Sequence, residues 1–294
     1  MRIHSTNIFA TTIFRGATGL LISVLVAGCG LQKDVEVKLP SYDSELVLEC
    51  YLQNGILPSL TVTESVSYLN SNALPSVPTD ITVALTMPDG TVVPLGFSPN
   101  PLALRDTLLN EKFHTHIGNT PLLARPGDVF QITAFDTRGR RVTGTATMPS
   151  NVAIDSVDYK FNDKTGAERK AYFLTNFRDP ASPDDTYRIQ LHKGDPTRGV
   201  LRRRPETDIF LEDRLNNGRN FTVGTSYRFF AGDTVTATLY HTDQAFYRFR
   251  RSLNDARNAN GNPFAQPSAI YSTVQGGIGI FTVLNYNRLT RIVR

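Results

Sequence analysis

The amino-acid sequence predicts a mainly β protein made of two β-sandwich (immunoglobulin-like) domains, the second of which carries one amphipathic helix. Three observations lead to this prediction. Short runs of alternating apolar and polar residues recur about every ten to fifteen residues, as in all-β sandwiches. Gly, Pro, Asn and Asp, which favour turns, separate these runs. The chain has 294 residues, which is enough for two domains of ordinary size.

The first domain is expected over residues 41–150. Residues 81–87 alternate strictly, and Asp89 and Gly90 then supply the backbone conformations that a tight turn requires. A second hairpin is expected around the sequence DTRGR, and the Pro, Ser and Asn that follow Met148 mark the domain boundary. Strands of this domain are predicted at 45–52, 59–68, 81–87, 92–97, 129–136 and 140–147.

The second domain is expected over residues 151–294, with its helix near 242–256. Phe246, Phe249 and Leu253 recur there at three- and four-residue steps, the spacing of one helix face, and Thr242 is the expected N-cap. The glycines of QGGIGIF favour a turn or bulge over a phosphate-binding loop, because no helix pattern and no Lys-Ser/Thr pair follows them. Strands are predicted at 156–161, 171–177, 186–193, 233–241 and 278–285.

The N-terminal segment, residues 1–28, is expected to be a signal peptide rather than part of the fold. Its apolar stretch spans about eleven residues, well short of the roughly 20 that cross a bilayer as a helix. Val26-Ala27-Gly28-Cys29 resembles the lipobox of bacterial lipoproteins, which implies a diacylglycerol thioether and an N-acyl chain such as palmitate on Cys29. Several acyl chains anchor a protein durably. Residues 29–40 then form a lipidated tether; the alternative is an uncleaved anchor and a chance cysteine.

Composition excludes some classes of function. The formal net charge is +4 and falls towards zero when Arg2 and Arg15 leave with the signal peptide, so no nucleic-acid partner is expected. If Cys29 is lipidated, Cys50 is the one remaining cysteine and no intramolecular disulfide can form. Cys50 alternates with leucines and is expected to lie in the core. The sequence has no G-x-S-x-G motif, and we identify no other catalytic motif.

Several stretches in a fixed order resemble one protein family. These are KDVEVKLP, LVLECYLQNG and TATMP in the first half, and FRDPASPDDTYRI, AFYRFRRSL, NPFAQPSAIYSTV and GGIGIF in the second. Together they resemble the domain-of-unknown-function family numbered 4249 (DUF4249), a group of Bacteroidota lipoproteins. The resemblance implies an outer-membrane lipoprotein, often encoded beside a TonB-dependent transporter. It implies no established reaction, and no cofactor is expected beyond the lipid on Cys29.

Three groups of residues are candidate sites. His114 and His116 would share one face of a strand, a spacing found in metal sites, but the sequence ties no third ligand to them. We therefore expect no metal at these two residues. The alternative to a metal site is that both histidines are exposed polar residues near a loop. Arg202, Arg203 and Arg204 are candidates for contact with an anionic surface or an acidic partner, and a solvated charge run is the alternative. Tripeptides that resemble acceptors for bacterial O-glycosylation contain Thr107, Ser156 and Thr234.

Two functions from different classes compete. The first is a non-catalytic outer-membrane lipoprotein that acts as an accessory or binding subunit beside a TonB-dependent transporter, because the loops of sandwich domains carry binding. The second is a surface carbohydrate-binding protein or a hydrolase whose site is assembled from distant loops. No aspartate directly follows Cys29, and Lys33, Asp34 and Glu36 resemble an acidic tag for surface export. A protein facing the cell surface is therefore expected, with a periplasm-facing one as the alternative.

Overall fold

The described part of the chain is built mainly of β-strands. The computed structural model describes residues 42–67, 76–100, 113–182, 184–198, 200–201, 204–214, 217–259 and 269–294. From Ser44 onwards these residues belong to one unit by their contacts. They contain many strands and one α-helix, α2 (Gln244–Ala259), so the predicted mainly β fold is confirmed. In this part of the chain, no helix is both long enough and apolar enough to span a bilayer.

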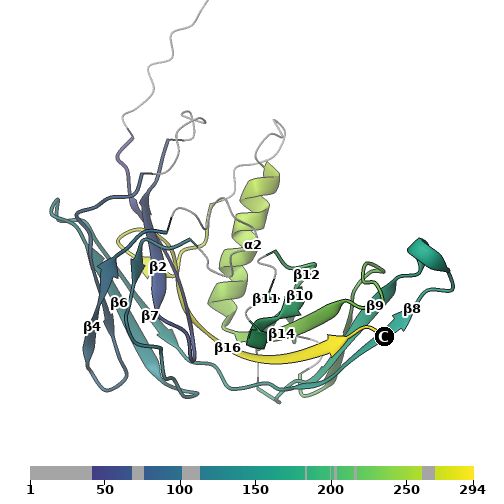
Figure 1. Ribbon diagram of the computed structural model, residues 1–294. Coiled ribbons are helices and arrows are strands. Elements are labelled where there is room, and N and C mark those ends of the chain that lie inside the picture. The colour runs from purple at the N-terminus through teal and green to yellow at the C-terminus, as the bar shows by residue number, and fades with distance from the viewer. Residues whose placement is uncertain are drawn as a thin grey trace, which may run out of the picture. The chain divides into compact units, whose positions relative to one another are not determined.

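The strands before residue 150 form the first sandwich (Figure 1). Every strand predicted there is present, with ends shifted by a few residues in places. On β1, inward side chains such as Leu48 and Cys50 are buried and alternate with partly exposed ones. They share one core with Phe130 and Ile132 of β6. The strands are β1 (Leu46–Gln53), β2 (Ser59–Glu64), β3 (Thr82–Thr86), β4 (Val92–Phe97), β5 (His116–Ile117), β6 (Val129–Phe135) and β7 (Arg141–Thr147).

Most of the strands after residue 150 form a second sandwich with its own core. A three-stranded sheet, in the order β13-β9-β8, covers the larger sheet that contains β10, β14 and the second half of β16. Phe173 and Phe177 of β9 meet Ile189 and Leu239 of the larger sheet in this core. The strands after residue 150 are β8 (Ile154–Phe161), β9 (Ala171–Arg178), β10 (Thr186–Asp195), β11 (Val200–Leu201), β12 (Thr207–Glu212), β13 (Asn220–Gly224), β14 (Thr234–Thr242), β15 (Val274–Gln275) and β16 (Ile278–Ile292). Of these, β15 pairs with β7 and belongs to the first sandwich.

One long strand, β16, belongs to both sandwiches. Its first half pairs in parallel with β1, and its second half pairs antiparallel with β14. Gly279 lies where β16 begins to pair with β1, at a φ of +135°, and a Cβ there would lie 1.9 Å from the carbonyl oxygen of Leu48. Only glycine fits this position, because the backbones approach so closely. Because β16 is hydrogen-bonded to strands of both sandwiches, the two do not separate cleanly along the chain. The domain boundary at residue 150 therefore stays a prediction.

Helix α2 covers the larger sheet through an aromatic contact layer. Phe246 and Phe249 are buried in a third cluster with Ile280 and Leu284 of β16. The helix begins differently from the prediction, because Asp243, not Thr242, caps it. The Oδ1 atom of Asp243 accepts a hydrogen bond from the N–H of Phe246 at 2.6 Å. The hydroxyl of Thr242 instead contacts the hydroxyl of Thr186 in the sheet.

Candidate functional site

A surface pocket lies between helix α2 and strand β12. Its volume is about 390 Å³, the size of a small-molecule site. One wall comes from the helix and the other from β12, which is hydrogen-bonded to β10 along its whole length. The pocket is lined by Asp208, Phe210, Tyr247, Arg250, Arg251, Leu253, Asn254 and Arg257.

The burial of one helix face determines which side chains line this pocket. Phe246 and Phe249 fix the helix on the sheet. The flank beside that buried face then carries Tyr247, Asn254 and three arginines at helical steps, so their side chains follow one stripe along the helix. Phe210 of β12 also packs against the buried face of the helix, because its ring centroid is 6.0 Å from that of Phe246.

Arginine and aromatic side chains dominate the electrostatics of the pocket. The guanidinium carbons of Arg250 and Arg188 lie 5.4 Å and 5.1 Å from the ring centre of Phe210, within the range of cation–π attraction. Asp208 is the acidic lining residue, and Arg188 holds it through two hydrogen bonds of 2.8 Å and 2.7 Å. Burial opposes ionisation of Asp208, but the hydrogen bonds and charge of Arg188 lower its pKa overall.

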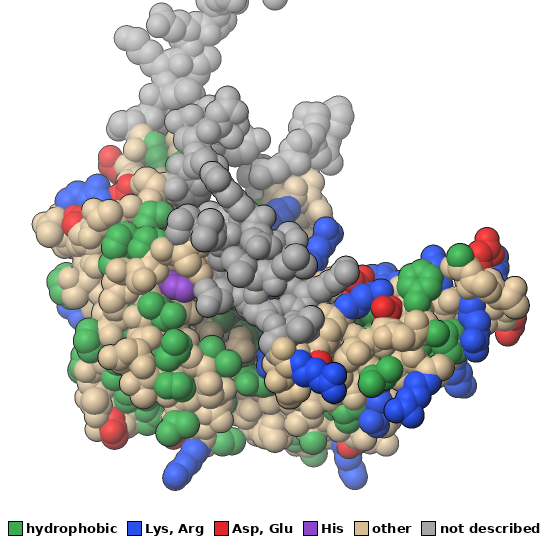
Figure 2. Space-filling view, in the orientation of Figure 1, with side chains coloured by type: hydrophobic (Ala, Val, Ile, Leu, Met, Phe, Trp, Pro, Cys, Tyr) green, Lys and Arg blue, Asp and Glu red, His purple; other side chains and the backbone are tan. Residues whose placement is uncertain are grey.

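The pocket is suited to binding an anion. The buried Nε atom of Arg250 has no hydrogen-bond partner, while the side chains of Arg251 and Arg257 are exposed. An exposed guanidinium can present a planar pair of donors to a carboxylate or a phosphate. In Figure 2, Lys and Arg side chains are more numerous over the part of the surface formed after residue 150 than over the first sandwich. The pocket therefore lies in the more basic half of the described unit.

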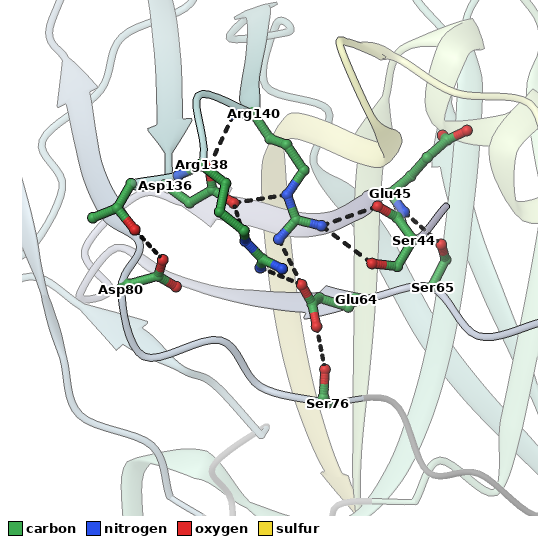
Figure 3. Close-up of polar contacts among 10 residues, drawn as sticks. Ser44, Glu45, Glu64, Ser65, Ser76, Asp80, Asp136, Arg138 and Arg140 are labelled. Atoms are coloured by element: carbon green, nitrogen blue, oxygen red, sulfur yellow. Dashed lines mark hydrogen bonds and ion pairs between the residues drawn. The ribbon is translucent and has the colours of Figure 1, made fainter. Parts of the chain in front are cut away.

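A second cluster of charges, in the first sandwich, has a structural role (Figure 3). Asp136 accepts hydrogen bonds from the backbone N–H and Nε of both Arg138 and Arg140 and so shapes the β6–β7 turn. The two arginines also pair with Glu64 on β2. Arg140 Nη1 donates to the carbonyl oxygen of Ser44 at 2.9 Å. Through Arg140, the cluster joins Ser44, at the start of the folded unit, to the β6–β7 hairpin.

Several predicted site residues lie outside the described part of the chain, so their predictions stay untested. Among the others, Arg204 is exposed and does not line the pocket. Ser156 on β8 donates a hydrogen bond to Asp158 at 2.7 Å, and Thr234 begins β14 and is half-buried. The residues outside the description are Cys29, Thr107, Arg202 and Arg203, together with the signal peptide 1–28 and the tether 29–40.

His114 and His116 are both buried rather than exposed. His116 Nδ1 lies 2.9 Å from the hydroxyl of Thr115, and Nε2 lies 3.3 Å from the carbonyl oxygen of Ile81. Burial lowers the pKa of His116, although the contact with Ile81 opposes the shift. Among the described residues, the side chains close enough together to hold a metal ion are Asp179, Asp185 and Asp213, and neither histidine is among them. These contacts make His116 a packed core residue.

Arg250 and Arg251 lie within the helix that the sequence predicts, but the sequence did not predict the pocket. The missing partners are Phe210 and Asp208, because β12 was not predicted as a strand. A second stripe was nevertheless visible on the helix. Tyr247, Arg251, Asn254 and Arg257 recur at three- and four-residue steps beside the apolar stripe, a pattern that indicates a polar face with a shared role.

Comparison with known families extends over nearly the whole described unit. A family model described as "Domain of unknown function (DUF4249)" matches residues 32–290. No curated protein matches the chain. The matched range includes both sandwiches, helix α2 and all residues that line the pocket.

Proposed function

The chain belongs to the DUF4249 family, and from that premise we propose that it is a non-catalytic, lipid-anchored subunit of the outer membrane that binds a partner through the pocket beside helix α2. The proposed partner is a TonB-dependent transporter. The protein faces the cell surface and is held there by acyl chains on Cys29. The observation that carries the proposal is the set of three arginines around a pocket in which Asp208, the one acidic residue among the described lining residues, is already paired with Arg188.

The sequence around Cys29 supports the anchor. A short apolar stretch ends at Val26-Ala27-Gly28-Cys29, and the family match begins at residue 32, directly after this segment. A tether of about a dozen residues reaches up to about 35 Å when extended, which clears the lipid head groups. The hydrogen bonds from Arg140 to Ser44 hold the start of the described unit to the first sandwich.

The chemistry of the pocket supports binding rather than catalysis. Glycoside hydrolysis, the reaction most often carried out by carboxyl groups alone, uses two that face the same substrate. Asp208 is the one carboxyl among the eight lining residues that the structure describes, and Arg188 keeps it ionised and hydrogen-bonded. Exposed arginines next to aromatic rings instead favour recognition of an acidic protein segment, because such side chains dominate binding energy at interfaces.

Affinity purification from detergent-solubilised outer membranes tests the proposal. The bait is the full-length lipoprotein, as wild type, as the Arg251→Ala/Arg257→Ala double variant, or as Arg248→Ala. Arg248 is exposed on the same helix but does not line the pocket, so it is the matched control. We expect wild type and Arg248→Ala to retain a TonB-dependent transporter and the double variant to lose most of it. Equal recovery with all three baits, or no transporter with wild type, would overturn the proposal.

A hydrolase remains the second candidate because three aspartates from distant loops come together in the second sandwich. The ligand oxygens of Asp179, Asp185 and Asp213 lie within 4.8 Å of one another. Their burial argues against it, since Asp179 and Asp213 are only 2% and 1% exposed and a substrate has no access to them. Hydrolysis of a glycoside or peptide panel by the wild type, abolished by Asp179→Asn, would favour this second candidate.

A further inference from the structure

Two loops at one end of the second sandwich bring three aspartates together. Asp179 directly follows β9, Asp185 directly precedes β10, and Asp213 directly follows β12. The strand β9 belongs to the three-stranded sheet, whereas β10 and β12 belong to the larger one. One carboxylate oxygen from each residue lies within 4.8 Å of the other two. The cluster therefore connects the two sheets at the edge of their shared core.

The hydrogen bonds of the cluster leave part of its charge without a partner. Asp179 is satisfied, because it accepts from the hydroxyl of Tyr187 and from the N–H of Gly218 at 2.7 Å. Among the residues that the structure describes, both oxygens of Asp213 and the Oδ2 atom of Asp185 are buried without a hydrogen-bond partner. Asp213 is only 1% exposed. A buried carboxylate in this state costs several kcal/mol unless a cation or a proton compensates for it.

One histidine compensates for only part of this charge. His241 Nε2 lies 3.1 Å from Asp185 Oδ1, and its Nδ1 lies 2.8 Å from the carbonyl oxygen of Ser150. A carbonyl oxygen only accepts, so Nδ1 carries the hydrogen of that contact. At most one positive charge thus faces three carboxylates within the described contacts. Carboxylates that ligate metal ions are commonly held by hydrogen bonds from neighbouring groups, and His241 is such a neighbour of Asp185.

From this geometry we infer that Asp179, Asp185 and Asp213 bind one Ca²⁺ ion, which ties the β9–β10 loop to the loop after β12 and so holds the two sheets together. The ligand set consists of oxygen atoms alone, which hard cations such as Ca²⁺ prefer. Ca²⁺ holds its oxygen ligands at about 2.3–2.6 Å, so two of them lie at most about 5 Å apart. The spacing of the three oxygens agrees with this limit.

The two unpartnered oxygens of Asp213 are suited to bidentate ligation, and water can complete the six to eight ligands that Ca²⁺ takes. The rival arrangement is a proton shared within the cluster. Burial first, and the charge of Asp179 second, raise the pKa of Asp213, although the nearby backbone of Asp185, which is outside hydrogen-bond geometry with the carboxylate, opposes the shift. The two arrangements differ in their response to added calcium, because only the first binds the ion.

Calcium binding and thermal unfolding of the full-length lipoprotein in detergent decide between them. The protein is first stripped with EDTA and then titrated with CaCl₂ by calorimetry, followed by melting with and without the ion. We expect one Ca²⁺ per chain. We also expect the midpoint temperature to rise by about 5 °C or more at 100 times the dissociation constant. A protein that binds no Ca²⁺, or that responds to Mg²⁺ and not to Ca²⁺, overturns the assignment.

The variant Asp213→Asn separates loss of the site from loss of the fold. Without calcium it should melt at or above the temperature of the wild type, because a buried unpartnered charge has been removed. Its melting should no longer respond to CaCl₂. Asp255→Asn, on the exposed face of helix α2, is the matched control and should respond as the wild type does. A calcium response that persists in both Asp213→Asn and Asp179→Asn contradicts the proposed ligands.

Tb³⁺ luminescence gives a second, spectroscopic readout. Tb³⁺ replaces Ca²⁺ in oxygen sites and emits when a neighbouring aromatic ring absorbs light. The chain has no tryptophan, and the Tyr187 hydroxyl contacts Asp179 directly. We expect emission from the wild type that Ca²⁺ displaces and that Asp213→Asn lacks. Equal emission from the wild type and this variant would show that Tb³⁺ binds elsewhere and would contradict the proposed site.

Discussion

Replacement of Glu64 by glutamine should weaken the first sandwich in a way that depends on pH. Glu64 pairs with Arg138 and Arg140 and accepts a hydrogen bond from the Ser76 hydroxyl at 2.6 Å (Figure 3). These hydrogen bonds, that of Ser76 first, lower its pKa from 4.5 to about 2. The variant Glu64→Gln keeps the shape of the side chain and removes its charge together with one of its two acceptor oxygens.

The size of the effect follows from the pKa shift and from the exposure of the partners. A shift from 4.5 to about 2 is equivalent to about 3 kcal/mol at 1.36 kcal/mol per pKa unit. Because the side chain of Arg138 is 52% exposed, solvent screens part of this interaction. We therefore expect Glu64→Gln to lower the free energy of unfolding by about 1–2 kcal/mol at neutral pH.

The sign of the pH dependence is fixed by the direction of the shift. A carboxyl whose pKa is lowered by folding stabilises the protein above its unfolded pKa, and this contribution is lost as the pH falls through the folded pKa. The difference between the wild type and Glu64→Gln should therefore be full above pH 4.5 and shrink as the pH falls towards about 2. Other carboxyl groups titrate in both proteins and cancel in the comparison.

Urea unfolding of both proteins, repeated across this pH range, measures the difference. Glu168→Gln is the control, since Glu168 also pairs with a basic residue, Lys164, but is 73% exposed. Its effect should stay within about 0.5 kcal/mol at every pH. Equal stability of Glu64→Gln and the wild type at neutral pH, or a difference that grows on acidification, would refute the reasoning.

Three further predictions concern the shared strand, the helix and the orientation of the protein. Gly279→Ala should cost at least about 3 kcal/mol of unfolding free energy, because its Cβ meets the Leu48 carbonyl; Gly90→Ala, with open space around it, should cost only about 1 kcal/mol. Comparable losses in urea unfolding would contradict this. Asp243→Ala should cost about 0.5–2 kcal/mol through the lost helix cap, and an unchanged urea midpoint would argue against the cap. Protease added to intact cells should digest the protein; survival until the outer membrane is opened would instead place it in the periplasm.

The alternation of side chains made most strands predictable, and its absence explains those that were missed. Strands such as β1 and β6 have one buried face and therefore alternate clearly. In contrast, β5 has two residues, and β12 is half-buried along most of its length, so neither has a periodic pattern. The predicted end of β16 at 285 was too early. Arginines and asparagines in its second half interrupt the apolar pattern from which strands were predicted, although the strand continues to Ile292.

Contacts between distant segments could not be predicted from the sequence. The aspartates 179, 185 and 213 lie in turn-like stretches, and only the meeting of two sheets brings them together. The pocket likewise needs Phe210 of an unpredicted strand opposite the helix arginines. The N-cap was misplaced by one residue, since the pairing of Thr242 with Thr186 depends on strand register. Local pattern gives the elements, whereas these sites arise from how the elements pair.

Labelled palmitate offers a direct measurement of whether the protein is a lipid-anchored subunit. Cells that express the full chain, as wild type or as Cys29→Ser, are fed the label, and their outer membranes are isolated. Cys50 is buried in the first core in both proteins, so it provides no competing acylation site in the folded chain. We predict that the wild type carries the label and sediments with the outer membrane, while Cys29→Ser has neither property. An unlabelled wild type, or label that persists in Cys29→Ser, would contradict a lipid anchor at Cys29.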